Sequence, residues 1–191
     1  MGETQVAGLA ELLDRLGDAV AGPTVEARCA AVKRVLSDTI QAGAIALPER
    51  FYVPKAECYA RRLLHRDVER GFTAVVMTWG PGQGTALHDH AGMWCVEGTI
   101  DGEMEVLQYE LAEETADGRY RFERRGQVRA RPGAAGALIP PFEYHVLRNG
   151  FDDRVSLTLH VYGGEMDHCH LFEPDGDGWY RRGQRPLAYD G

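Results

Sequence analysis

The chain has 191 residues, an apolar fraction of 44% and a formal net charge of -8, so it is long and apolar enough to bury a sizeable core rather than stay disordered. The acidic balance argues against nucleic acid or an anionic membrane as a partner, and no apolar run is long enough to span a bilayer. We therefore expect one domain over residues 1–191.

The ends and the cysteines of the chain indicate its compartment. The N-terminal segment lacks a basic stretch followed by an apolar core, so no signal peptide is expected, and Val6 stands where a myristoylation signal has Ser or Thr. The cysteines are widely spaced and form no Cys-x-x-Cys pair, which favours reduced thiols over a disulfide framework and predicts a cytoplasmic protein. They are Cys29, Cys58, Cys95 and Cys169.

The first part of the chain, residues 1–45, is predicted to be helical because its apolar residues recur at helical spacing. Gly22-Pro23 should end a first helix, Thr24 can cap a second one, and Gly43 should end that helix. We expect these helices to cover a sheet rather than to carry chemistry.

After residue 72 the pattern changes to short strands separated by Gly-containing turns. Asp101-Gly102 and Asp117-Gly118 predict hairpins, and Asn149-Gly150 predicts another turn. Many short antiparallel strands with frequent turns are typical of a sandwich or barrel. A final hairpin or tail is expected over 174–191. The strand candidates are residues 72–79, 94–100, 104–111, 120–124, 155–162, 170–173 and 179–182.

Three histidines are candidate metal ligands. His88 and His90 follow the strand candidate 72–79 and are two residues apart, so on a strand they would share one face and could hold one ion. His145 lies in a comparable Gly- and Pro-containing context before the strand candidate 155–162. Imidazole suits zinc, copper, iron and nickel. Without His145, the pair could equally be two ordinary histidines in a solvated loop.

The first histidine segment resembles the first motif of the cupin superfamily, which has Gly, a spacer, His-x-His, Glu and a second Gly. Gly82, His88, His90 and Gly102 match that motif. Cys95 stands where the superfamily usually places its fourth ligand, Glu, so the resemblance implies three neutral histidines without a carboxylate.

The segment around His145 is similar to the second cupin motif. Pro140, His145 and Asn149 match it, whereas Phe142 replaces the usual Gly. The resemblance implies a mainly β protein, with a cupin-type antiparallel β-sandwich or small barrel and N-terminal α-helices packed on it.

Three further features narrow the resemblance to the thiol dioxygenase family, and within it to bacterial type I cysteine dioxygenases. They are Cys95 five residues after His90, the strand Ser156-Leu-Thr-Leu-His-Val-Tyr162, and the run Asp167-His-Cys-His-Leu-Phe172. The likeness covers about residues 59–173 as the catalytic β-core. It implies Fe(II) as cofactor, although spacing alone does not identify the metal, because three histidines also suit catalytic zinc.

The resemblance also implies roles for residues beside the metal. Tyr162 is expected near it as a hydrogen-bond donor, and in some family members the matching tyrosine is joined by a thioether to the residue at Cys95. His160 should share a face with Tyr162 and hydrogen-bond its hydroxyl, and Thr158 stands where most relatives have Ser. Alternatively, Cys95 fills core space and Tyr162 is a core aromatic, so the cross-link stays an open question.

Arg61 is the candidate for binding a substrate carboxylate. The order Tyr59-Ala60-Arg61 resembles the family's Tyr-x-Arg segment, and the planar guanidinium can pair both carboxylate oxygens. Relatives acting on 3-mercaptopropionate commonly have Gln there, so Arg61 favours an amino-acid thiol, and Tyr59 is expected to line the same pocket. Alternatively, Arg61 and Arg62 form a solvated face, and we expect one of the two to lie there. The remaining histidines, His65, His168 and His170, are expected to be structural or on the surface.

The predicted function is therefore that of an Fe(II)-dependent thiol dioxygenase. Its partners would be O2 and a small carboxylate-bearing thiol, which it would oxidise to the sulfinate. The favoured substrate is L-cysteine. The alternatives are 3-mercaptopropionate or mercaptosuccinate as substrate, a zinc- or manganese-dependent cupin isomerase or hydrolase, and a non-catalytic cupin that binds a small acid. The sequence does not indicate the oligomeric state.

Overall fold

A computed structural model describes residues 6–190 of the chain. Two α-helices, α1 (Leu9–Val20) and α2 (Val25–Gln41), precede a short 3-10 helix, η1 (Glu49–Tyr52). Thr24 caps α2 as predicted, since its side chain accepts a hydrogen bond from the backbone N–H of Ala27 at 3.2 Å. Residues 1–5 of the predicted helical region lie outside the described part. Within residues 6–190, no helix has both the length and the apolar character needed to cross a bilayer.

The rest of the described chain is mostly β-strand, which confirms a mainly β protein with N-terminal helices. The strands are β1 (Ala60–Asp67), β2 (Phe72–Trp79), β3 (Leu87–His88), β4 (Cys95–Asp101), β5 (Met104–Glu114), β6 (Arg119–Ala130), β7 (Ala135–Leu138), β8 (His145–Asn149), β9 (Ser156–Tyr162), β10 (His168–Pro174) and β11 (Tyr180–Pro186). The sequence patterns missed several short or charged strands (β1, β3, β7 and β8), and β6 is longer than predicted because its polar alternation continues along an exposed hairpin.

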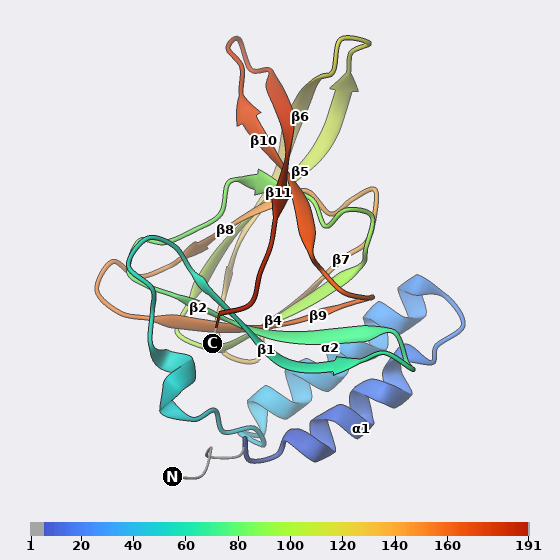
Figure 1. The fold of residues 1–191 in the computed structure, drawn as a ribbon, viewed down its shortest axis with the longest axis vertical. Helices are drawn as coiled ribbons and strands as arrows, with labels where there is room; N and C mark the ends of the chain where they lie inside the picture. The colour runs from blue at the N-terminus through green and yellow to red at the C-terminus, as the bar shows by residue number, and fades with distance from the viewer. Residues whose placement is uncertain (1–5, 191) are drawn as a thin grey trace.

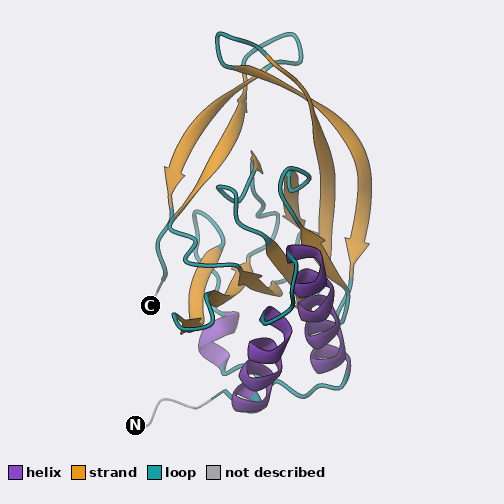
Figure 2. Cartoon of the chain, turned by 90° about the vertical axis from the view of Figure 1, so that its right-hand side faces the viewer, coloured by secondary structure: helices purple, strands orange, loops and turns teal. Residues whose placement is uncertain are grey.

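The strands form two antiparallel sheets. One has five strands in the order β1-β2-β9-β4-β7, and the other is a closed ring in the order β10-β11-β6-β5-β8-β3. The two helices cover one face of the five-stranded sheet, and the β5-β6 and β10-β11 hairpins rise on the side away from the helices (Figure 1). Figure 2 shows these hairpins arching over the middle of the molecule. The central strands of the sheet therefore face the helices on one side and the ring on the other.

Alternation along β9 and β4 divides their side chains between these two environments. On β9, Leu157, Leu159 and Val161 belong to the apolar cluster made with the helices. Tyr162, which follows Val161 and points to the other face of the strand, packs instead in a second cluster together with Cys95. Successive side chains of a strand point to opposite faces, so the inward face of each strand is the one that carries polar residues.

The hairpin predicted at Asp101-Gly102 joins β4 to β5 and brings the end of β4 against the start of β9. Gly102 has a φ of +78°, and a Cβ there would lie 2.2 Å from Oγ of Ser156. Only glycine adopts this conformation at so close an approach without strain. The turn thus secures the register of the two strands that face the histidines.

Candidate metal centre

The three candidate ligands come from three different segments and converge between the two sheets. His88 on β3 lies opposite His145 on β8 in the ladder. His90 lies on the loop that leads from β3 to β4. One ring nitrogen of each histidine lies within 4.8 Å of the others, so a single ion can contact all three. Among the described residues, these three histidines are the group of side chains whose ligand atoms lie close enough together to hold one metal ion.

Backbone carbonyls orient two of the rings. Nδ1 of His88 lies 3.1 Å from the carbonyl oxygen of Ala86, and Nδ1 of His145 lies 2.8 Å from that of Glu143. A carbonyl only accepts, so each Nδ1 carries the proton and each Nε2 keeps a free lone pair. Nε2 of His145 is buried and lacks a partner among the described residues. An unpaired imidazole lone pair in such a cluster fits a bound transition-metal ion.

Burial keeps the cluster uncharged. It lowers the pKa of His88, and it lowers the pKa values of His90 and His145 well below the usual range, with the neighbouring imidazoles adding to the effect. The imidazoles are therefore neutral near pH 7, which is the form that binds a metal. Three neutral ligands leave a divalent ion with its full charge, which favours an anionic ligand such as a thiolate.

The five-stranded sheet supplies the wall beside the histidines. Cys95 on β4 lies directly opposite Tyr162 on β9 in the ladder, and the Tyr162 ring centroid lies 6.0 Å from that of His90. Burial raises the pKa of the Cys95 thiol and that of the Tyr162 phenol well above their usual ranges. Both groups are therefore protonated, and each retains a hydrogen to donate.

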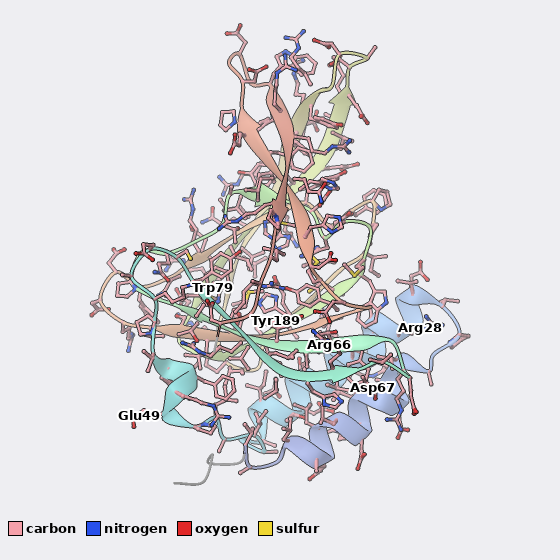
Figure 3. All side chains as sticks on the ribbon, viewed as in Figure 1. Arg28, Glu49, Arg66, Asp67, Trp79 and Tyr189 are labelled. Atoms are coloured by element: carbon pink, nitrogen blue, oxygen red, sulfur yellow. The ribbon has the colours of Figure 1, made fainter. Side chains whose placement is uncertain are left out.

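His160 is held by a chain of hydrogen bonds that begins at Trp79, which Figure 3 labels on β2. The Trp79 indole N–H donates to Oγ1 of Thr158 at 2.9 Å, and the Thr158 hydroxyl lies 2.8 Å from Nε2 of His160. The hydroxyl of Thr158 thus links the Trp79 indole to Nε2 of His160. Trp79 was not singled out in the sequence, because an apolar strand residue gives no sign of this role.

The resemblance predicted a hydrogen bond from His160 to the Tyr162 hydroxyl. Among the described hydrogen bonds, none joins the two, and their rings stack with centroids 6.0 Å apart. Nδ1 of His160 lies instead 3.9 Å from Sγ of Cys95. The Thr158 hydroxyl is on the far side of the imidazole, so the chain from Trp79 ends facing β4.

Glu97 is the site residue that the sequence analysis missed. Its Oε2 lies 3.8 Å from Nε2 of His145 and 3.6 Å from Nδ1 of His160, and it has no hydrogen-bond partner among the described residues. Burial raises the pKa of the Glu97 carboxyl to about 8. The signal was present, since an acidic residue two positions after Cys95 on an apolar strand must share the Cys95 face.

Arg61 is buried on β1 and faces the space between the sheets. Its terminal nitrogens donate to the carbonyl oxygens of Ala188 at 3.2 Å and Met166 at 3.1 Å, while its Nε has no partner among the described residues. A guanidinium has five N–H donors, so three remain for a ligand. Arg61 and Tyr59 line a cavity of about 140 Å³.

Arg62 faces the opposite side of β1 and is also buried. Its guanidinium donates to Oγ1 of Thr78 at 2.9 Å and to the carbonyl oxygen of Val53 at 2.7 Å. The expectation that Arg61 or Arg62 lies on a solvated face is therefore wrong, because Arg61 is 4% exposed and Arg62 is 9% exposed. The segment before β1 covers Arg62, and the C-terminal segment covers Arg61.

That C-terminal segment crosses β1 beside Arg61. The backbone N–H of Arg61 donates to Oδ2 of Asp190 at 2.9 Å, and the Asp190 N–H donates to the Arg61 carbonyl at 2.7 Å. Lys55 pairs with the same carboxylate at 2.6 Å. Tyr189 lies near Arg66 in Figure 3, and its hydroxyl donates to Glu165 at 2.8 Å. The segment thus helps to enclose the Arg61 side of the site.

The Asp between the two histidines holds their loop in place. The Asp89 carboxylate accepts hydrogen bonds from the backbone N–H groups of Ala91 at 3.0 Å and His170 at 2.9 Å. Its Oδ2 also lies 2.9 Å from Nδ1 of His170. His170 therefore links β10 to the histidine loop and lies outside the three-histidine cluster.

Sequence comparison identifies a matching family and several relatives. A family model described as "Cysteine dioxygenase type I" matches residues 6–175. Cysteine dioxygenase type 1 of Rattus norvegicus is 21% identical over 115 residues, which cover 60% of this chain and 56% of that protein. The protein of the same name from Homo sapiens is 20% identical over the same shares. The match thus spans somewhat more than half of the length of these curated relatives.

Solved structures give weaker likenesses. The TT1209 protein of Thermus thermophilus is 22% identical with a TM-score of 0.44, covering 60% of this chain and 90% of that one. The Cnp3 cupin domain of Schizosaccharomyces pombe is 11% identical with a TM-score of 0.42, covering 56% and 61%. Since these scores are low, the family assignment depends on the sequence match over residues 6–175.

The buried Glu97 carboxyl predicts how the stability of the metal-free protein changes with pH. Its pKa is about 8 in the folded chain, against 4.5 for an ordinary carboxyl. Between these values the unfolded chain is stabilised by ionisation and the folded chain is not, so the free energy of unfolding falls as pH rises, by up to about 1.4 kcal/mol per unit. Glu97→Gln should abolish that component of the fall.

The measurement is urea unfolding with a chelator present at pH 6 and pH 8. The control is Glu69→Gln, which changes an exposed glutamate between β1 and β2. The wild type and the control should lose more stability over this interval than Glu97→Gln. Equal losses in all three proteins would contradict the assignment.

Proposed function

This chain belongs to the cysteine dioxygenase type I family, and on that basis we propose that it oxidises a small carboxylate-bearing thiol, first L-cysteine, to its sulfinate with O2. The reaction is RSH + O2 → RSO2⁻ + H⁺, in which both oxygen atoms end on the sulfur and the sulfur supplies the electrons. The observation that carries the proposal is the buried cluster of His88, His90 and His145, with one nitrogen of each within 4.8 Å of the others.

The cofactor that we propose is Fe(II), held by His88, His90 and His145. When bound, it would supply the activation of O2 and a binding position for the thiolate. The chain's own residues then have to hold the substrate, exclude water and direct hydrogen-bond donors. The neutral state of the three imidazoles supports this assignment, because burial disfavours their protonated forms.

In this proposal, Arg61 receives the substrate carboxylate with its remaining N–H groups, beside Tyr59. The Tyr162 hydroxyl is a donor close to the histidines, and its raised pKa keeps the proton on oxygen. The chain of Trp79, Thr158 and His160 holds the imidazole behind it. Donors that are oriented before the reaction stabilise developing charge without a reorganisation cost.

The proposal is tested by metal analysis combined with O2 uptake. The purified protein should contain iron and should consume O2 and L-cysteine in equal amounts with formation of the sulfinate. A panel with 3-mercaptopropionate and mercaptosuccinate distinguishes the alternative substrates. Zinc or manganese without thiol-dependent O2 uptake would indicate another cupin enzyme, and binding of a small acid without turnover would indicate a binding protein.

The ligand set makes the next prediction. His145→Ala should lose most of the bound iron and the O2 uptake, because it removes one of three protein ligands. His65→Ala is the matched control, since His65 lies on β1, packs against Phe72 of β2 and is not part of the three-histidine cluster. Iron content is measured on protein whose fold is verified by circular dichroism. Full iron occupancy in His145→Ala would refute the ligand assignment.

The proposed contact between Arg61 and the substrate carboxylate can be tested separately. Arg61→Ala should lower kcat/KM for L-cysteine by about 2–5 kcal/mol of transition-state stabilisation, as expected when one partner of a buried charge pair is removed. Cysteamine, which has no carboxylate, should be a poor substrate of the wild type and little affected by the change. Equal turnover of cysteine and cysteamine by the wild type would exclude the carboxylate contact.

We further propose that Cys95 and Tyr162 form a thioether during turnover. A C–S bond replaces the S–H bond of Cys95 and one ring C–H bond of Tyr162, and O2 takes up the two hydrogens with their electrons as H2O2. Their direct opposition in the β4–β9 ladder supports it, since facing side chains of such a pair are close. Peptide mass spectra before and after turnover should show a linked pair lighter by two hydrogen atoms. Unlinked peptides from fully active protein would show that the bond is dispensable.

A further inference from the structure

Five buried side-chain atoms have no hydrogen-bond partner among the described residues, and most of them surround the histidine cluster. Two are nitrogens of the cluster itself, one belongs to Arg61, one to Glu97, and one to Glu143 on the loop before β8. A buried polar atom without a partner is costly, so in a native site it pairs with a bound ligand, an ion or an ordered water. The atoms are Arg61 Nε, His90 Nδ1, Glu97 Oε2, Glu143 Oε2 and His145 Nε2.

Three of these atoms require three different chemical groups. Nε2 of His145 offers a lone pair and suits a metal ion. Nε of Arg61 carries a hydrogen and needs an acceptor such as a carboxylate. Oε2 of Glu97 can accept a hydrogen bond, and the strongest donor for a carboxyl oxygen is a charged or metal-polarised N–H.

No described protein group meets the need of Glu97. The nearest ring nitrogen is Nδ1 of His160. Its distance of 3.6 Å to Oε2 exceeds a normal hydrogen bond. Glu97 is also not a member of the cluster whose ligand atoms lie within 4.8 Å of one another. It therefore lies beside the ligand set, at a position from which it can contact a group bound there.

We infer that Glu97 accepts a hydrogen bond from the amino group of the substrate and thereby selects amino thiols over thiols that lack an amine. This inference rests on the proposed thiol oxidation. An α-amino acid with a β-thiol carries its amine and its carboxylate on one carbon and its thiol on the next. In this inference the thiol binds at the histidine cluster, the amine at Glu97 and the carboxylate at Arg61. The Glu97 oxygen accepts an N–H bond whether or not the carboxyl is ionised.

The lack of a close protein partner favours a recognition role for Glu97 over a purely structural one. Its side chain is 11% exposed, and its Oε2 faces ring nitrogens of His145 and His160. Glu97 also borders a cavity of about 340 Å³ that reaches Lys33 on α2, and the lining of this cavity does not include the three candidate ligands or Arg61. A carboxyl that served only to hold the fold would be paired with a protein donor, as Glu103 is with Arg129 and Arg131 at 3.0 Å. Glu97 has no such pair.

The test compares three thiols in the iron-loaded protein, with rates expressed per bound iron. L-cysteine carries both polar groups, 3-mercaptopropionate carries the carboxylate alone, and cysteamine carries the amine alone. Glu97→Leu should lower kcat/KM for cysteine and cysteamine about ten- to a hundredfold, as expected for loss of a charge-assisted hydrogen bond, and should leave 3-mercaptopropionate within about twofold. Glu97→Gln, which keeps an acceptor oxygen, should give an intermediate loss.

Lys33→Met is the matched control, because it changes the other charge of the same cavity without touching the histidines. It should leave the ratio of the three substrates unchanged. An equal loss for all three thiols in Glu97→Leu would overturn the inference and make Glu97 a residue that only supports the metal ligands. No change for any thiol would overturn it as well.

Anaerobic binding provides a readout that does not depend on turnover. Calorimetric titration of the iron-loaded protein should show that Glu97→Leu weakens L-cysteine binding and leaves 3-mercaptopropionate binding as it was. Absence of O2 uptake by the wild type with every thiol would refute the proposed function. The binding comparison would then still decide on the amine contact, since a Glu97-independent preference for cysteine would refute that contact alone.

Discussion

Burial of the inward faces of β4 and β9 is the constraint on which the rest of the site depends. One face of these strands packs against α1 and α2, so the alternate side chains must point into the space between the sheets. There, burial holds the imidazoles neutral and keeps the protons on Cys95 and Tyr162. Groups that would be ordinary acids or bases in water therefore become metal ligands and hydrogen-bond donors.

Orientation at this site comes mainly from backbone carbonyls and from short side-chain contacts. The carbonyls of Ala86 and Glu143 turn His88 and His145, and Asp89 holds the loop between β3 and β4. The Thr158 hydroxyl holds Nε2 of His160 at 2.8 Å. Because these contacts are local, the rings of His88 and His145 are oriented without a bound metal.

Arg61 and Glu97 approach the histidines from different strands and with opposite hydrogen-bonding character. Arg61 offers donors from the edge strand β1, where the C-terminal segment covers it, and Glu97 offers an acceptor from β4. Recognition of a small ligand by few groups requires that each be buried and unpaired before the ligand arrives, since unmatched ligands then leave a desolvated atom. In the proposed function, substrate choice would therefore depend on the same burial that keeps the imidazoles neutral.

The sequence alone determined the helices, the hairpins at Asp101-Gly102 and Asp117-Gly118, the strand β2 and the set of three histidines, because these depend on local spacing and turn chemistry. Only the tertiary structure decided that Glu97 faces His160, that Trp79 donates to Thr158, and that Arg61 and Arg62 are both buried. Those facts depend on which strands pair and on what covers β1, and long-range pairing leaves no periodic signal in the chain.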